Sequence, residues 1–185
     1  MLLEFNIDKA IAATAYVIER DGGASDMFPL IKKLYYSDRT ALIAWGNSVT
    51  GDSLASLPKG PIVSTIYNLL KGQGPKEDQI KWDAVIQRKR PSFDIVLRKE
   101  SNKGFLSQRE LEVLEESRVT INTIRGSISD WLHTHCPEWK NPGRSSAPID
   151  PSTILRLSKK SEEEIHRLEE ANEEIRFINS LLSAR

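Results

Sequence analysis

The sequence contains a single cysteine, Cys136, among its 185 residues. One cysteine excludes an internal disulfide, and a chain of this length can bury a core without disulfides or a structural metal. No apolar run approaches the roughly 18 residues that a membrane-spanning helix needs. Glu4 and Asp8 place charges where a secretory signal would need apolar side chains. These absences predict a soluble, cytoplasmic protein with no membrane partner.

An excess of one charge sign is also absent, since 26 lysines and arginines balance 26 aspartates and glutamates. A neutral chain has no long-range attraction to polyanions, so nucleic acid is not expected as a partner. The basic run Arg88–Arg90 has acidic residues before and after it. We interpret this run as a solvated turn, with a phosphate contact as the minor alternative.

The signatures of several enzyme classes are missing. There is no G-x-S-x-G elbow, and the segment 51–60 lacks the spacing of a nucleotide-binding loop. Residues 133–138 include two histidines, a cysteine and a glutamate, but zinc needs three or four convergent ligands and the remaining histidine is His166. We therefore predict no enzyme activity, no cofactor and no metal, with an imidazole hydrogen-bonded beneath Trp131 or Trp139.

The first half of the chain is dominated by helical periodicity. Apolar residues recur every three or four positions over residues 8–20 and again from Met27 to Trp45, which predicts two helices packed on each other. The segment 49–54 combines a turn glycine with short alternating flanks and predicts a small hairpin. Pro61 suits the first turn of a short helix that ends at residues 72–75.

The second half is less regular. Residues 76–104 show little periodicity except for a strand over 93–98. Pro91 before this strand favours a sheet edge or a strand start. Ser107 and Glu110 form a capping box that opens a helix to about Ile124, and a further helix reaches Leu132. Proline and serine then predict a surface loop up to residue 151.

A charged helix is predicted from Pro151 to Leu182, and a second capping box at Ser161 could break it in two. One apolar register of this tail has asparagine at two heptad positions, as in a dimeric coiled coil. The other register is wholly apolar and suits docking on the chain's own domain or on a partner. Both registers contain Ile165, Leu168 and Ile175.

These patterns together predict a mainly α (α+β) fold. It comprises a compact helical domain over residues 1–140 with a small β-hairpin or sheet, a proline- and serine-rich loop over 141–151, and a charged amphipathic helical tail over 152–185. Homodimerisation through the tail is one expectation. A helix-turn-helix DNA-binding regulator is the alternative function, because residues 106–114 resemble the first helix of such a motif, although 119–124 continue without a clear turn.

With these elements in place, residues 28–140 resemble the Panacea, or SocA-like, antitoxin domain of bacterial and phage toxin–antitoxin systems. The matching elements, in order, are Lys33–Asp38, Trp45–Gly46, Thr50–Asp52, Gly60–Val63, Ile66–Gly72 and His135–Trp139. Their order and spacing carry the resemblance, since no single element is specific. It implies an antitoxin that neutralises a cognate toxin by direct protein–protein binding, in some members as a chaperone-like or proteolytic adaptor with a chaperone or protease as a further partner.

The resemblance also indicates which positions to examine for partner binding. These are Tyr35, Tyr36, Asp38, Asp52, Gly60, Pro61 and Tyr67, to which the tail adds Ile165, Leu168 and Ile175. We interpret Gly60 and Pro61 as setting the backbone at a helix start, and Tyr35 as filling the core. Asp52 and Tyr67 are predicted to form a polar surface groove. The chain departs from the family pattern in segment 87–103 and after Pro151.

Overall fold

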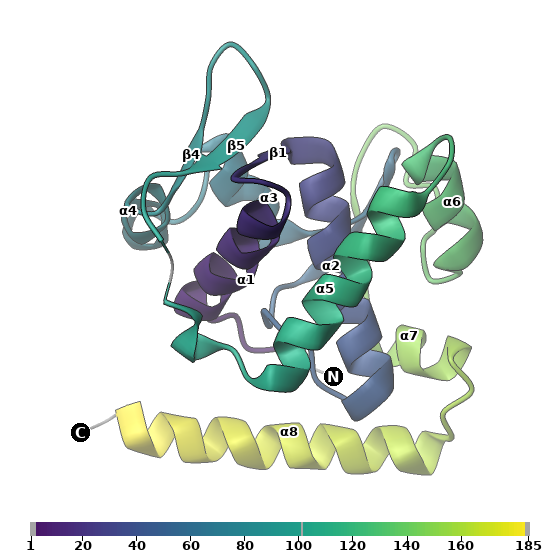
Figure 1. The fold of residues 1–185 in the computed structure, drawn as a ribbon. Helices are drawn as coiled ribbons and strands as arrows, with labels where there is room; N and C mark the ends of the chain where they lie inside the picture. Colours follow the sequence, from purple (N-terminus) through teal and green to yellow (C-terminus); the bar gives the residue numbers. More distant parts are fainter. Residues whose placement is uncertain (1–2, 101, 184–185) are drawn as a thin grey trace.

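The fold is that of a computed structural model, which describes residues 3–100 and 102–183, without the side chains of residues 179, 180, 182 and 183. At its centre lies α2 (Met27–Trp45), packed against α1 (Ile7–Arg20) and α5 (Gln108–Thr123) (Figure 1). Asp26 caps α2 by accepting a hydrogen bond from the backbone N–H of Phe28 at 2.8 Å. Gly46 ends it in a left-handed conformation. The mainly helical α+β class and the first two helices are confirmed.

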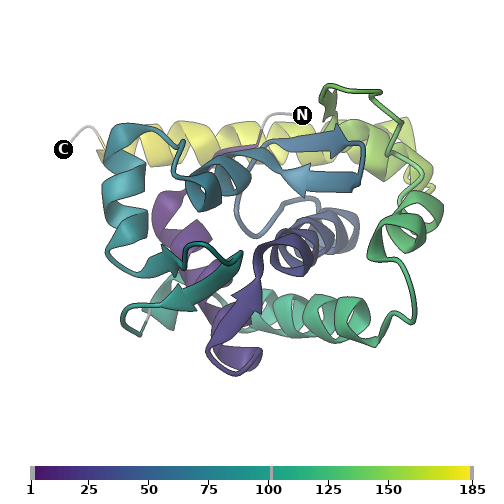
Figure 2. The same cartoon turned by 90° about the horizontal axis from the view of Figure 1, so that it is seen from above.

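Two small antiparallel sheets flank these helices. One has the order β1 (Ala24–Asp26), β5 (Asp94–Leu97), β4 (Ile86–Arg88). The other has the order β3 (Gly60–Val63), β2 (Leu54–Leu57), β6 (Ala147–Ile149). Strand β3 lies beside α2, which is seen end-on in Figure 2. Each sheet therefore joins segments that are far apart in the sequence.

The hairpin predicted over residues 49–54 is wrong. The hairpin that forms is β2–β3, with Pro58 and Lys59 in its turn, whereas residues 49–53 make an irregular loop. The helix predicted from Pro61 also begins later, as α3 (Ser64–Lys71), because Pro61 belongs to β3. Strand β3 is an edge strand of its sheet, where the missing N–H of a proline is tolerated.

The least regular region of the sequence contains α4 (Lys76–Asp83), β4, β5 and a short 3-10 turn, Lys103–Phe105. The strand predicted here is confirmed as β5. It is the central strand of its sheet, so the edge alternative is wrong, and Pro91 lies in the turn that precedes it. Helix α4 lacked an amphipathic signal because only Trp82 among its residues is buried.

The last third of the chain begins with α5, whose capping box at Ser107 and Glu110 is confirmed. After α6 (Ile128–His135) the predicted surface loop is interrupted by β6, which pairs with β2. The tail consists of two helices, α7 (Pro151–Leu157) and α8 (Glu162–Ser183), and α8 runs along one side of the molecule (Figure 1). The capping residue Ser161 separates them, as its contacts with Glu164 indicate. None of the described helices is both long and apolar enough to span a bilayer.

Candidate functional site

Two buried carboxylates hold the loop between α2 and β2. Asp38 accepts hydrogen bonds from the backbone N–H groups of Val49 and Thr50, each at 3.0 Å, and from the Thr50 hydroxyl. Asp52 accepts from the N–H groups of Thr65 at 2.9 Å and Ile66 at 2.8 Å, so it caps α3. Burial raises the pKa of both carboxyls, that of Asp38 to about 7.

The prediction that Asp52 and Tyr67 form a polar groove at the surface is therefore wrong for Asp52. Asp52 is fully buried, whereas Tyr67 is only half-buried. The two residues are connected through the chain, because Asp52 fixes the first turn of the helix that carries Tyr67. The sequence singled out Asp52 as a motif residue, but it did not show that the carboxylate faces the interior, where it caps α3.

A buried ionic cluster joins α2 to the segment that follows α6. The Tyr35 hydroxyl donates to Glu138 Oε1 at 2.5 Å, and Arg39 Nε donates to the same oxygen at 2.6 Å. Burial and the Glu138 carboxylate raise the pKa of Tyr35, which is fully buried as predicted. Burial likewise raises the pKa of the Cys136 thiol to about 12. Sequence reasoning missed the contacts of Glu138 because its partners lie about a hundred positions away.

Lys32 is almost completely buried, with 1% exposure, and its ammonium donates to the Pro61 carbonyl at 2.9 Å. Burial lowers the pKa of this lysine to about 7. Gly60 next to it has a φ of +98°, and a Cβ there would lie 3.3 Å from Lys32 Nζ. Gly60 and Pro61 thus set the backbone as predicted, although in a strand rather than at a helix start.

The aromatic residues around α6 form two stacks. His133 stacks on Trp139 with ring centroids 3.5 Å apart, and His135 stacks on Trp131 at 4.0 Å. Tyr36 meets the edge of Trp131 at 5.5 Å. The predicted packing of imidazole against tryptophan is confirmed, and burial lowers the pKa of His133. Within the described part of the chain, no three histidine, cysteine or acidic residues are grouped as metal ligands.

An open depression of about 600 Å³, here called the apolar groove, lies between the start of α2, the β2–β3 turn, α3 and the β4–β5 turn. It is lined by Asp26, Met27, Phe28, Ile31, Lys32, Leu57, Pro58, Lys59, Ile62, Tyr67 and Phe93. Phe93 is 56% exposed, and Tyr67 and Phe28 are half-buried. Tyr67 is the predicted site residue that faces this groove, while Lys32 lies at its floor.

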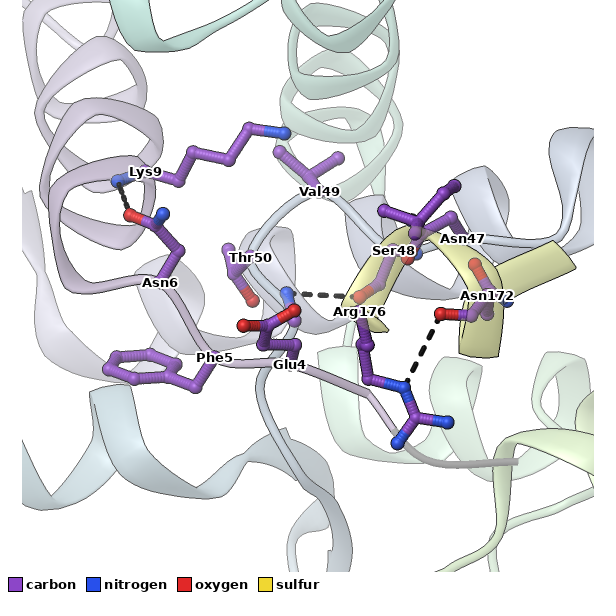
Figure 3. A pocket seen from close by; sticks show the side chains of 12 residues that line it. Glu4, Phe5, Asn6, Lys9, Asn47, Ser48, Val49, Thr50, Asn172 and Arg176 are labelled. Carbon is purple, nitrogen blue, oxygen red and sulfur yellow. Dashed lines mark hydrogen bonds between the residues drawn. The ribbon is translucent and has the colours of Figure 1, made fainter. Parts of the chain in front are cut away.

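A smaller pocket of about 280 Å³ lies where helix α8 packs beside the N-terminal segment and the loop after α2 (Figure 3). Asn172 donates to the Gly46 carbonyl at 2.9 Å, and Leu168 packs so closely on Gly46 that a Cβ there would lie 2.2 Å from its side chain. Ile165 is 2% exposed, whereas Ile175 is 49% exposed. Of the predicted tail residues, Ile165 is buried and Leu168 packs on Gly46, whereas Ile175 is half exposed and lines this pocket.

Comparison with known protein families places this geometry in context. The family described as "Antitoxin SocA-like, Panacea domain" matches residues 30–140, a segment that includes Tyr67, both loop-holding carboxylates and the Glu138 cluster. No curated protein and no solved structure gave a significant match. The matched segment covers more than half of the sequence, so this chain belongs to the SocA-like Panacea antitoxin family.

Proposed function

We propose that this chain neutralises a cognate toxin by direct, stoichiometric binding without turnover, and that the apolar groove is the contact surface. The observation that carries the proposal is the groove itself, an apolar depression with aromatic residues at its surface and charged residues at its rim. Grooves with apolar walls suit the binding of a partner's side chains, and aromatic residues are enriched at protein interaction sites. Membership of an antitoxin family supports a toxin as the occupant.

Buried motif residues hold the elements that carry the groove residues. Asp52 caps α3, which presents Tyr67, and Lys32 fixes β3 through the Pro61 carbonyl. We therefore propose positioning roles for Tyr35, Asp38, Asp52, Gly60 and Pro61, with Tyr67 in direct contact with the toxin. Tyr36, half-buried against Trp131, lies outside the groove and would contribute only through α6.

The test is complex formation between the purified chain and the protein encoded beside its gene, measured by size exclusion and titration calorimetry. Tyr67→Ala and Phe93→Ala should each weaken binding by about ten- to a hundredfold, because aromatic anchors dominate interface energy. Val119→Ala, an exposed apolar residue on α5, is the matched control and should bind normally. A wild-type chain that forms no complex would contradict the proposal.

Further parts of the proposal concern organisation, partners and location. The domain would comprise residues 1–140, the linking segment 141–151 and the tail 152–185. The exposed apolar residues of α8, with the half-exposed Ile175 beside them, would make a second contact that pairs two copies. If the chain acts as an adaptor, a protease or chaperone also joins the complex. The rate at which the toxin is degraded, measured with and without the chain, tests this. We propose the cytoplasm as the location, where a buried free thiol such as Cys136 is common.

The alternative, a DNA-binding regulator, has weaker support. Helix α6 would occupy the position of a recognition helix after α5, yet it carries an aspartate and two histidines and no lysine or arginine. A promoter fragment that is shifted by the chain at moderate salt would revive this alternative.

A further inference from the structure

A second, basic pocket of about 210 Å³ lies between α3, α4 and the β4–β5 hairpin. Its lining includes four cationic side chains, Lys71, Arg88, Arg90 and Arg98, and one carboxylate, Asp83. Arg88 and Arg90 belong to the basic run that the sequence predicts to be a solvated turn, and Arg90 lies exposed in the turn between β4 and β5. The fold brings both arginines together with Lys71 and Arg98 on one concave surface.

The cations of this pocket have no carboxylate partner among the residues that the structure describes. Among the described residues none of the four takes part in an ion pair, and the Asp83 carboxylate accepts a hydrogen bond from Gln79 Nε2 at 2.8 Å. The Nε atom of Arg88 is buried and has no hydrogen-bond partner within the described part of the chain. Convergent like charges repel one another, and an anion bound among them relieves this repulsion.

The basic pocket and the apolar groove form one continuous surface. The Arg88 guanidinium lies over the ring of Phe93, 4.6 Å from its centroid. Lys71 Nζ lies 5.0 Å from the centroid of Tyr67. Phe93 and Tyr67 line the groove, whereas Arg88 and Lys71 line the pocket. A chain segment that fills the groove therefore meets positive charge at its border.

We infer that this combined surface binds an acidic amphipathic segment of a protein partner, with apolar side chains in the groove and a carboxylate among Arg88, Arg90 and Arg98. The guanidinium fork matches the two oxygens of a carboxylate. The chain's zero net charge gives no general attraction to nucleic acid, and the aliphatic walls at Met27, Ile31 and Leu57 suit apolar side chains. The inference rests on the proposed function and specifies the chemistry of the toxin segment.

The experiment compares the affinity of the wild-type chain, Arg90→Glu, Arg98→Glu and a control, Arg125→Glu, for the protein encoded beside its gene, across a range of salt concentrations. Arg90, Arg98 and Arg125 are all exposed, so charge reversal should leave each variant folded. Arg90→Glu and Arg98→Glu should each weaken binding at least about tenfold at low salt and less at high salt, because a charge pair is lost and screened. Arg125→Glu should match the wild type.

The outcomes separate this inference from the proposed function. If the wild-type chain forms no complex, both fall. If it binds and the two pocket variants bind equally well, the inference is overturned while the proposed function stands. Inorganic phosphate and a short single-stranded oligonucleotide are titrated as competing anions. Oligonucleotide binding that depends on Arg90, together with toxin binding that does not, would overturn the inference in favour of a nucleic-acid site.

Discussion

Single buried polar side chains hold the walls of the apolar groove in place. Lys32 connects α2 to β3, Asp52 connects the preceding loop to α3, and Glu138 connects α2 to the segment after α6. A buried polar group is costly unless it is hydrogen-bonded, so each of these residues ties the position of one element to that of another. Substitution of any of these three residues should therefore lower the free energy of unfolding, and should affect partner binding only through the loss of structure.

Lys32 makes stability depend on pH. Its ordinary pKa is 10.5, and burial lowers it to about 7, so between these values the unfolded chain binds a proton that the folded chain does not. Stability should therefore rise with pH over this window, by up to about 1.4 kcal/mol per pH unit, and this contribution is lost as the pH falls to 7. Urea unfolding of the wild type and of Lys32→Met from pH 7 to 10 measures it. Parallel curves for the two proteins would contradict this prediction.

Gly60 offers a test with an internal control. Gly60 and Gly126 have similar positive φ values, +98° and +106°, but only Gly60 has neighbours within 4 Å of an added Cβ. Gly126→Ala should report backbone strain alone, about 1 kcal/mol, whereas Gly60→Ala should cost about 1–3 kcal/mol more because the buried Lys32 must shift. The denaturant midpoints of both variants, compared with the wild type, measure the two losses of stability. Equal losses would show that the contact with Lys32 is unimportant.

At the scale of elements, prediction succeeded where one element buries one continuous face. Helices α1, α2 and α5 were predictable because their apolar residues recur at helical spacing and their caps stand in the sequence, as at Asp26 and Ser107. The hairpin was predicted in the wrong segment because Gly51 resembles a turn glycine. Its φ of +71° belongs instead to an irregular loop that Asp38 holds. Strand β6 is only three residues long and acquires its structure from pairing with β2.

The tail helices should differ in their importance for stability. Ile154 and Leu155 of α7 are completely buried, whereas the outer half of α8 exposes Ile175, Ile178 and Leu181. A chain ending at Asp150 should therefore lose roughly 3–6 kcal/mol more than a chain ending at Lys160, the contribution of two buried aliphatic side chains. Thermal unfolding of both truncations tests this. Equal stabilities would contradict it and would favour one structural unit for residues 152–185.

At the scale of the whole molecule, the fold class and the family were predictable, but the groove was not. Its walls come from the start of α2, the β2–β3 turn, α3 and the β4–β5 turn, and no single segment carries a recognisable pattern. The basic pocket was not predictable for the same reason, since it adds Lys71 and Arg98 to the arginines of the run 88–90. The family resemblance singles out Tyr67, whereas only the folded chain places it in one groove with Phe93 and 5.0 Å from the ammonium of Lys71.

The exposed apolar residues of α8 predict concentration-dependent self-association. Ile178→Ser with Leu181→Ser should shift a dimer towards monomer without lowering the thermal midpoint, because both side chains are more than half exposed in one copy. Light scattering coupled to size exclusion measures the mass. Glu174→Ser, on the same helix, is the control and should leave the mass unchanged. A wild-type chain that is monomeric at all concentrations would contradict the prediction.

The pairing of β6 with β2 has a consequence during translation. Strand β2 leaves the ribosome long before residues 147–149 are made, so one of its edges stays unpaired while about ninety further residues are added. A product that stops before β6 would keep that edge open and would lack the buried side chains of α7. Synthesis that is interrupted before residue 147 should thus yield aggregation-prone fragments, because an unpaired strand edge is a template for pairing with another chain.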